Sequence, residues 1–593
     1  MDRRALVLAL LGLGSHGALA AQTDRYELSL QPDFDFFTFH GSETVRFENR
    51  TGKPLAEVPL SLYPNARALV AAGSRNLVVR EVTLGGKTAA FDAKGTVLRV
   101  TLAPPVAAGS IAELAITFDG ILPRMKEGES SLLGQGVDQL GELFGMASKE
   151  GGDYGILAYG DGTLSFGNWY PQLCPWVDGA FRTPEESTQG DMSFAEAADY
   201  QLTVRVPKGV VVAASGAQVR ETPLQAGLVE LVFDLPQGRN VAVEMSRDLA
   251  QSHTKSGNVT VTSYYKKADA EHGTRVMEHA AKALAFYEKA FGPYPWTELD
   301  VVEAPLKGGA GGVEFTGLVT CSSGLYGQME AEMAPLLSLL GTVGGDSPTG
   351  EAGAAGAMPD LKEGMGEMLE FVVAHEVAHQ WWNAAVGSDS QRSPFLDEAL
   401  ANFSALRYFA YAHGDAAAER QRELQLAMAY QLHRAFGGED HAVDAPASSF
   451  AGPIAYSAIV YGKGGLFFEE LVKRYGEKPV LAALSSYYRD GLHQVRRSPD
   501  LERALTSGLG KKAEVAALWQ RWIVETHGDE DIGQGALGEM LRGSGLGDLL
   551  GNPALKGDGQ DLQDLGKVLE ELLGEAASSG ESAADPGGVE PEP

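Results

Sequence analysis

Hydrophobic and polar residues alternate along the first half of the chain. Apolar residues two positions apart recur in short segments, among them Leu28 and Leu30, Val45 and Phe47, Leu98 and Val100, Leu202 and Val204, and Leu231 and Phe233. This period of two predicts strands with one buried face, and the Gly, Pro and Asn residues between the segments favour turns and antiparallel pairing. We therefore predict that residues 21–265 form an antiparallel, β-sandwich-like domain.

The pattern changes to helical spacing near residue 274. Apolar residues then recur three or four positions apart, as Val276, Ala280, Ala283, Leu284 and Tyr287 do, and Gly292-Pro293 marks the end of that helix. A strand predicted at residues 299–302 leads into a glycine-rich turn at residues 307–312, and helical segments dominate residues 368–525. We therefore predict that residues 266–527 form a second, mainly α-helical domain and that the whole chain is a multidomain α+β protein.

The N-terminus has the pattern of a secretory signal. The basic residues Arg3 and Arg4 precede a short apolar run at residues 5–14, and the small residues Ala18 and Ala20 suit cleavage before Ala21. We therefore expect residues 1–20 to be a signal peptide and the mature chain to be exported, periplasmic or extracellular, and soluble. No later apolar run reaches the length of a membrane-spanning helix, so we expect no transmembrane segment.

Two segments contain few bulky apolar residues. Residues 341–366 are rich in glycine and predict a mobile surface loop, which we expect to cover or gate the cleft beside the segment that follows. Residues 528–593 are strongly acidic and contain no aromatic residue, so they cannot bury enough apolar surface to offset the entropy of ordering. We predict that these last residues form a disordered tail.

Charge and cysteine content narrow the chemistry. The 593 residues include 48 Lys and Arg against 79 Asp and Glu, a formal charge of -31 that argues against nucleic acid as a partner. Cys174 and Cys321 are too few for a disulfide framework or a thiolate metal cluster. A single bridge between them is possible, but free buried thiols are favoured, and any metal must use His, Asp or Glu. The sequence does not indicate an oligomeric state.

The sequence H-E-x-x-H lies in an apolar segment at residues 369–382 that predicts a buried helix. His375 and His379 are four residues apart, so both imidazoles project from one helix face and can share a zinc ion. Glu376 lies at the flank of that face, where it can accept a proton from a metal-activated water. The pattern therefore predicts one catalytic Zn²⁺ ion.

A catalytic zinc site needs a third protein ligand, and Glu398 follows His379 at a suitable distance. Ser393-Pro394 predicts a helix start with Ser393 as N-cap, which places Asp397 and Glu398 in or near the first helical turn. For Asp397 the favoured interpretation is that it complements the helix dipole. We expect Asn402, four residues after Glu398, to orient that ligand.

Together these residues resemble a known family. The segment H-E-V-A-H-Q-W-W, followed by Glu398 within F-L-D-E-A-L-A-N-F, resembles the gluzincin motif of the M1 zinc metallopeptidases of the aminopeptidase N type. The segment Gly311-Gly312-Val313-Glu314-Phe315 is similar to the family's exopeptidase loop, and residues 455–464 are similar to its tyrosine segment. The resemblance covers roughly residues 26–525 and implies a thermolysin-like catalytic domain behind the β domain.

The resemblance also implies roles for individual residues. Glu314 would bind the α-amino group of a peptide, and Gly311 and Gly312 would let the backbone approach the substrate. Tyr461 would stabilise the tetrahedral intermediate of peptide hydrolysis, with Tyr456 in the wall of the substrate pocket or behind Tyr461. These roles predict a zinc aminopeptidase that acts on peptide substrates.

Three alternatives remain open at this point. Val313 and Phe315 stand where the family has Met and Asn, so a zinc endopeptidase is one alternative. A non-catalytic peptide-binding protein of the same fold is another, although binding alone has no need for the general base Glu376. A third is a hydrolase that acts on a non-peptide electrophile such as an epoxide.

Overall fold

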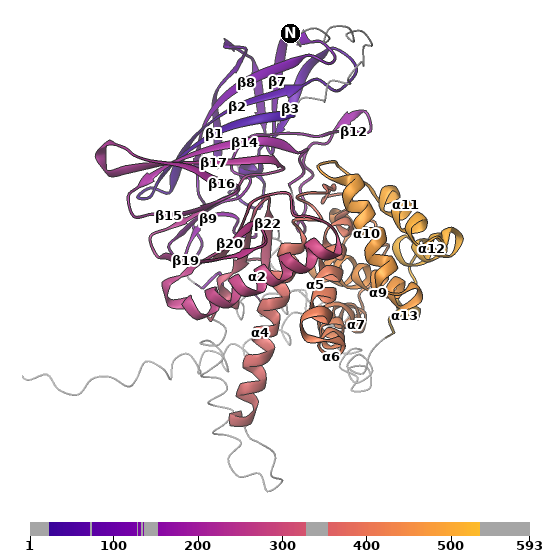
Figure 1. The fold of residues 1–593 in the computed structure, drawn as a ribbon. Coiled ribbons are helices and arrows are strands. Elements are labelled where there is room, and N and C mark those ends of the chain that lie inside the picture. Colours follow the sequence, from indigo (N-terminus) through magenta and orange to yellow (C-terminus); the bar gives the residue numbers. More distant parts are fainter. Residues whose placement is uncertain are drawn as a thin grey trace, which may run out of the picture.

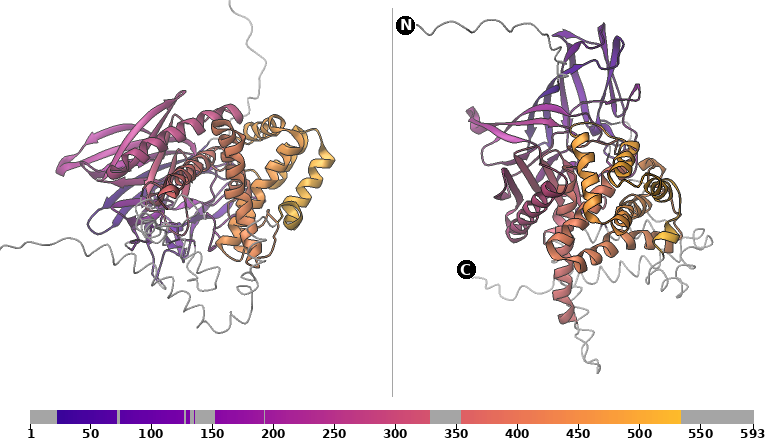
Figure 2. Two further views of the ribbon diagram at one scale, coloured as in Figure 1. Left: turned by 90° about the horizontal axis from the view of Figure 1, so that it is seen from below. Right: turned by 45° about the vertical axis from the view of Figure 1, so that its right-hand side comes forward.

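The chain folds into a β-rich half followed by a helix-rich half (Figure 1). The computed structural model describes residues 23–71, 74–126, 128–131, 135, 152–191, 193–327 and 354–533. The predicted signal peptide lies outside these residues, as do residues 341–353 of the predicted loop and residues 534–593 of the predicted tail. In both views of Figure 2 the two halves lie side by side.

The largest sheet has eight strands in the order β16-β17-β14-β1-β2-β8-β4-β5. In chain order they are β1 (Asp24–Asp33), β2 (Thr38–Glu48), β4 (Leu77–Leu84), β5 (Lys87–Thr88), β8 (Ile111–Ile121), β14 (Ala198–Pro207), β16 (Ala217–Pro223) and β17 (Leu228–Gly238). Leu28, Leu30 and Val45 are buried, as the period of two predicted. However, β1 pairs in parallel with β14, so the sheet is mixed rather than fully antiparallel. The long chain segment between these two strands makes that parallel pairing possible.

Smaller sheets complete the β-rich half. One contains β11 (Gln172–Leu173), β3 (Leu55–Ser61), β7 (Val97–Val106) and β6 (Phe91–Lys94); another contains β15 (Val211–Ala214), β18 (Val243–Ser246), β10 (Thr163–Phe166) and β9 (Leu157–Gly160); and β12 (Trp176–Val177) pairs with β13 (Ala180–Phe181). The fully buried Trp169 packs against Phe39 of β2 and Phe166 of β10, with ring centroids 6.2 and 6.4 Å away. This aromatic packing joins the large sheet to a smaller one.

The helix-rich half begins with a five-stranded sheet in the order β19-β20-β21-β23-β22. Its strands are β19 (Leu249–Ser256), β20 (Val259–Lys266), β21 (Glu298–Ala304), β22 (Gly312–Phe315) and β23 (Leu318–Ser322). Helix α2 (Ala270–Ala290) packs on β19 and β20 and buries Val276, Ala280 and Leu284, the residues whose spacing predicted it. β19 and all but the last residue of β20 lie before residue 266, so this sheet contains strands from both sides of the predicted domain boundary.

Helices form the remainder of the described chain. They are α4 (Ala354–Ala378), α5 (Glu398–His413), α6 (Asp415–Gln421), α7 (Met428–Ala435), α8 (Pro453–Tyr456), α9 (Gly464–Tyr475), α10 (Glu477–Gly491), α11 (Ser498–Gly508), α12 (Lys512–Trp519) and α13 (Gly528–Asp531), with π-helices η6 (Arg422–Ala427), η8 (Ser457–Lys463) and η9 (Gln520–Val524) and 3₁₀ turns η1 (Tyr63–Asn65), η2 (Gln225–Gly227), η3 (Lys267–Asp269), η4 (Ser323–Leu325), η5 (Pro394–Leu396) and η7 (Ala447–Ser449). Helix α4 packs against α2, α5, β22 and β23. The helix-rich second half confirms the predicted fold class.

Two predicted loops are partly structured. Helix α4 begins at Ala354, so residues 354–366 of the predicted glycine-rich loop belong to the helix that carries His375. Residues 528–533 of the predicted tail are also part of the fold, because Asp440 accepts a hydrogen bond from the Gly528 backbone N–H.

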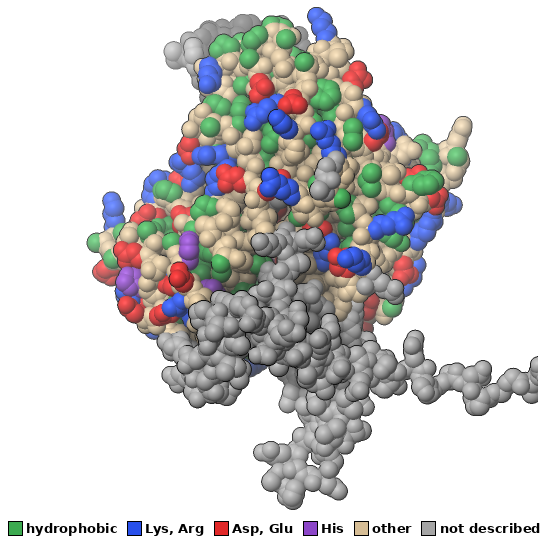
Figure 3. Space-filling model, turned by 180° about the vertical axis from the view of Figure 1, so that it is seen from behind, with side chains coloured by type: hydrophobic (Ala, Val, Ile, Leu, Met, Phe, Trp, Pro, Cys, Tyr) green, Lys and Arg blue, Asp and Glu red, His purple; other side chains and the backbone are tan. Residues whose placement is uncertain are grey.

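Three further observations concern membrane-spanning helices, cysteines and surface charge. The helices among the described residues are all too short or too polar to cross a membrane. Cys174 and Cys321 are both buried and free, as favoured from the sequence. On the face shown in Figure 3, acidic and basic side chains are interspersed and do not gather into a single patch.

We predict that Glu244→Gln stabilises the protein at neutral pH. Glu244 on β18 is buried, accepts a hydrogen bond from the Ser165 hydroxyl at 2.7 Å, and has its pKa raised by burial to about 8. Because the folded chain binds this proton more tightly than the unfolded chain, the contribution of Glu244 to stability is fully present below about pH 4.5 and is lost as the pH rises towards 8. The cost is about 3 kcal/mol at pH 7.

Urea unfolding at several pH values checks this prediction, with tryptophan fluorescence as the signal. The Glu244→Gln variant should lose part of the decline in unfolding free energy between pH 5 and 8. Glu57→Gln, at a half-exposed surface ion pair, serves as the control and should leave that decline unchanged. Equal slopes for all three proteins would contradict the prediction.

Candidate active site

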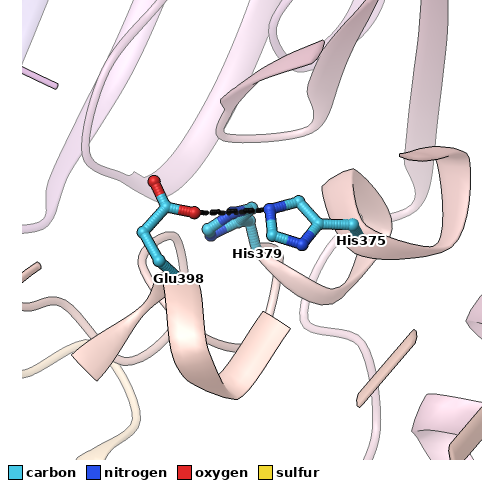
Figure 4. Close-up of side chains that lie close together, drawn as sticks. All are labelled: His375, His379 and Glu398. Atoms are coloured by element: carbon cyan, nitrogen blue, oxygen red, sulfur yellow. Dashed lines mark hydrogen bonds and ion pairs between the residues drawn. The ribbon is translucent and has the colours of Figure 1, made fainter. Parts of the chain in front are cut away.

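His375, His379 and Glu398 meet at the junction of α4 and α5 (Figure 4). His375 lies on α4, and His379 lies one turn further along, directly after the last residue of that helix. Both are buried, with 8% and 1% of their surfaces exposed. Their Nε2 atoms lie 3.0 Å apart, and each lies 3.3 Å from Oε2 of Glu398. The sequence predicted this grouping, and the fold brings all three side chains together. We refer to the three facing atoms as the ligand triangle.

The start of α5 positions Glu398. As predicted, Ser393 lies at the N-cap position of a helical segment that begins with Pro394, but this segment is the 3₁₀ turn η5, the Ser393 side chain makes no capping hydrogen bond, and α5 itself begins at Glu398. Asp397 is the N-cap of α5, and its side chain accepts a hydrogen bond from the Glu398 backbone N–H at 2.9 Å. The hydroxyls of Ser388 and Ser390 also donate to Asp397, which fixes the cap in place. The Ser393 hydroxyl binds Asp444.

Hydrogen bonds determine which nitrogen of each histidine faces the triangle. Nδ1 of His375 lies 2.8 Å from Oδ1 of Asn402, and Nδ1 of His379 lies 3.1 Å from the Trp382 carbonyl oxygen. Because both partners are acceptors, Nδ1 must donate in each ring, which leaves Nε2 with a free lone pair. Asn402 therefore orients His375, whereas the sequence suggested that it would orient Glu398.

The ligand triangle fits a zinc ion. Two imidazole lone pairs and a carboxylate oxygen repel one another at 3.0 to 3.3 Å unless a positive charge lies between them. Ligand bonds of about 2.0–2.2 Å in tetrahedral geometry separate neighbouring ligand atoms by about 3.3–3.5 Å. The triangle has nearly these dimensions, and Oε2 of Glu398 has no hydrogen-bond partner among the described residues. Two histidines and one glutamate also leave a fourth position open.

Glu376 is buried beside the triangle. It is 4% exposed, and its Oε2 atom has no hydrogen-bond partner in the described structure. Burial raises the pKa of Glu376 well above its ordinary value; nearby His379 opposes that rise, and Glu314 and Glu398 add to it. A carboxyl group with a raised pKa can accept and release a proton near neutral pH, as a general base must.

Gly311 and Gly312, which precede Glu314, face different side chains. A Cβ atom on Gly312 would lie 2.4 Å from Oε1 of Glu376, so only glycine permits the observed approach of that carboxylate to β22. A Cβ atom on Gly311 would meet Val372 at 3.3 Å, a tight contact, and the Gly311 carbonyl accepts the Ser322 N–H of the adjacent strand. The close approach that we predicted at these glycines is therefore made by the Glu376 side chain, which lies against the backbone of Gly312.

Glu314 on β22 points towards the same centre. Its side chain is 10% exposed, and its Oε1 atom lies 3.8 Å from Nδ1 of His379. Ligand atoms of Glu314, Glu376 and His379 all lie within 4.8 Å of one another. Asn383 donates a side-chain hydrogen bond to Oε1 of Glu314. A negatively charged group thus lies immediately next to the ligand triangle.

The two tyrosines lie on the opposite element, the π-helix η8 and the end of α8. The Tyr461 ring lies 5.8 Å from the His375 ring in a nearly parallel orientation, and its hydroxyl interacts with Glu398. Tyr456 is buried, and its ring packs edge-on against Tyr461 at 5.7 Å. Burial raises the pKa of both hydroxyls, and the Glu398 carboxylate raises it further, so both remain hydrogen-bond donors.

Sequence reasoning missed residues that the β-rich half contributes. Asp191 lies near Glu314, Asp397 and Glu398, and its pKa is raised well above the ordinary value by burial and then by Glu314. The preceding Gln189 donates to the carbonyls of Ala447 and Phe450 in the helix-rich half. These residues lie in the irregular segment S-T-Q-G-D, where no periodicity or spacing marks them.

Comparison with known proteins shows similarity to metallopeptidases and aminopeptidases. Residues 361–522 match the peptidase family M1 domain. The chain is 22% identical over 510 residues to Aminopeptidase 2 of Candida albicans, which covers 84% of this chain and 47% of that protein. It is 25% identical over 287 residues to the mitochondrial Aminopeptidase 2 of Saccharomyces cerevisiae, which covers 46% of this chain and 26% of that protein. The chain thus spans less than half the length of these two relatives.

Solved structures share the fold. The M1 zinc metallopeptidase from Deinococcus radiodurans has a TM-score of 0.54 at 16% identity, over 84% of this chain and 93% of that chain. A mutant of that enzyme bound to a Tyr-Ser-Ala substrate has a TM-score of 0.53. The matched family domain contains all three residues of the ligand triangle, and the shared fold extends over most of the chain. The helix-rich half of this protein therefore contains a peptidase family M1 domain.

Proposed function

We propose that the protein is a zinc aminopeptidase, which removes residues from the free N-terminus of peptides. The observation that carries this proposal is the position of Glu314, 3.8 Å from a histidine of the ligand triangle. In a peptide, about 2.5 Å separates the terminal nitrogen from the first carbonyl carbon. An acid that binds the terminal ammonium must therefore lie close to the metal ligands, as Glu314 does.

The proposed cofactor is one zinc ion held by His375, His379 and Glu398. The geometry of the ligand triangle and the family of the chain both support this assignment. Zinc in this position would supply Lewis acidity to an attacking water and to the scissile carbonyl. Asn402 and the Trp382 carbonyl would keep Nε2 of each histidine directed at the ion.

Glu376 and Tyr461 would move and stabilise charge during the reaction. The raised pKa of Glu376 suits a group that accepts a proton from the attacking water at its carboxylate and returns it to the leaving amine. The Tyr461 hydroxyl remains protonated at neutral pH and faces the triangle from η8. It would donate a hydrogen bond to the carbonyl oxygen as negative charge develops there. Tyr456 would support the Tyr461 ring.

Glu314 would fix the register of the substrate. Its carboxylate attracts the α-ammonium group. Gly311 and Gly312 would let the peptide backbone approach β22 closely. A peptide whose N-terminus is acetylated has no such charge, so the site would discriminate against it.

We expect stepwise removal of N-terminal residues from a free peptide and no cleavage of its N-acetylated twin. Mass spectrometry of both digests with the zinc-loaded protein checks this. Glu376→Gln should reduce kcat by about 10³-fold without loss of zinc, because it removes the general base and leaves the ligand triangle intact. Internal cuts in both peptides would instead establish an endopeptidase, and no cleavage of either would favour a non-catalytic peptide-binding protein.

Tyr461→Phe should lower kcat by about 10²- to 10³-fold, since a donor to the developing oxyanion is lost. The KM and the zinc content should stay within about threefold of the wild-type values, because the ring and its packing remain. Tyr475→Phe, at the end of α9, serves as the matched control and should leave kcat unchanged. An unchanged kcat in Tyr461→Phe would remove Tyr461 from the proposed mechanism.

We also propose that the protein is exported. The proposal depends on the basic, apolar and small-residue pattern of residues 1–20. Expression of the full chain in a bacterium, followed by cell fractionation and N-terminal sequencing, should yield a periplasmic or secreted form that begins at Ala21. A cytoplasmic protein that retains residues 1–20 would contradict export.

A further inference from the structure

We propose that Asn383 is a positioning residue that orients Glu314 for recognition of the substrate ammonium group. This inference depends on the proposed aminopeptidase function and concerns a residue outside the H-E-x-x-H helix and the glycine-rich loop. Asn383 lies in the turn directly after α4, four residues beyond His379. Its side-chain amide donates a hydrogen bond to Oε1 of Glu314.

The backbone of Asn383 has an unusual conformation. Its φ of 130° lies in the region that favours glycine and is costly for a residue with a side chain. Glycine would fit this backbone without strain, but glycine cannot donate a side-chain hydrogen bond. The chain therefore keeps an asparagine at a position where the backbone alone favours glycine. Strain of this kind is typical of residues whose side chains serve a site.

The surrounding turn is bonded firmly enough to hold that strained conformation. The Asn383 N–H donates to the Val386 carbonyl, and the N–H groups of Ala384 and Ala385 donate to the carbonyls of His379 and Gln380, directly after α4. The buried Arg239, which comes from the β-rich half, donates through Nε to the Ala384 carbonyl at 3.0 Å. The Asn383 side chain is thus held in a fixed position relative to α4.

The strand that carries Glu314 is fixed to the same helix end. The Gln380 side chain donates to the Phe315 carbonyl at 2.9 Å and accepts the Gly317 N–H at 2.9 Å. The turn that contains Asn383 and the strand that contains Glu314 are therefore both hydrogen-bonded to the residues directly after α4. Small movements of β22 cannot easily change the distance between the two side chains.

The hydrogen bond determines how Glu314 presents its charge. A carboxylate can only accept, so the amide nitrogen of Asn383 must face Oε1. Within the described chain this is the single side-chain donor to Glu314, and His379 Nδ1, 3.8 Å away, is engaged with the Trp382 carbonyl. With Oε1 bound, Oε2 remains available for an ammonium group. A fixed carboxylate orientation lowers the entropy cost of binding that group.

Replacement of Asn383 by glycine separates this role from a structural one. Asn383→Gly removes the amide but relieves the backbone strain, so its Tm should equal or exceed that of the wild type. If Asn383 positions Glu314, the KM for a free peptide should rise about tenfold while kcat stays within about twofold. The preference for the free peptide over its N-acetylated twin, measured as the ratio of kcat/KM values, should fall by a similar factor.

A matched control replaces another non-glycine residue that has a positive φ and lies far from the site. Ala226 lies in the exposed loop between β16 and β17 with a φ of 59°, so Ala226→Gly should leave the KM and the peptide preference unchanged. An Asn383→Gly variant with wild-type KM and peptide preference would overturn the positioning role while leaving the aminopeptidase proposal intact. Equal losses for free and acetylated peptides would also overturn it. A wild-type enzyme without preference for free N-termini would refute both proposals.

Discussion

Two imidazole nitrogens and a carboxylate oxygen face one another at 3.0 to 3.3 Å in the buried centre of the helix-rich half. Groups that only accept hydrogen bonds are stable at such distances when a cation balances them. The pKa of His379 reflects this arrangement. Burial lowers the pKa, but the nearby carboxylates of Glu314 and Glu398 raise it by more, so that it lies well above its ordinary value. A site with this charge balance attracts cations, and both zinc and a peptide's terminal ammonium meet that requirement.

The surrounding fold supplies the groups that hold this charge in place. Helix α4 buries the histidines, the Asp397 cap fixes the first residue of α5, and the β-rich half reaches the site through two segments. Gln189 binds backbone carbonyls near Ala447, and Arg239 donates to the Ala384, Ala385 and Gln494 carbonyls. The β-rich half therefore helps to build the site, since it fixes the turn that follows α4.

The parts of the site that could be predicted from sequence are those whose geometry is local. Four-residue spacing on a helix places His375 and His379 together in any protein, and the family resemblance located Glu398, Glu314 and Tyr461. The partner predicted for Asn402 was Glu398, but the structure shows a hydrogen bond to His375. Spacing shows that two residues share a helix face, but it does not show which neighbour across the site they contact. Ser393 matched the sequence pattern of an N-cap, yet the intervening 3₁₀ turn moved the cap to Asp397.

Long-range contacts explain what the sequence could not show. The alternating pattern predicted strands in the β-rich half, but the parallel pairing of β1 with β14 depends on chain segments that are distant in sequence. Asp191 reaches Glu314 only through the packing of the two halves, and its segment has no local signature. Pattern analysis identifies which faces are buried, whereas the assembly of several elements decides which polar groups meet.

Two backbone positions beside Glu314 illustrate how the chain adapts to this crowded, charged centre. At Gly312 the Glu376 carboxylate approaches so closely that any side chain would collide with it, and the residue is glycine. At Asn383 the backbone itself favours glycine, yet the chain has a residue whose amide binds Glu314. At Gly312 the absence of a side chain makes room for a carboxylate, and at Asn383 a strained backbone carries a hydrogen-bond donor. Both choices follow from the same need to fix carboxylates around a cation within a small volume.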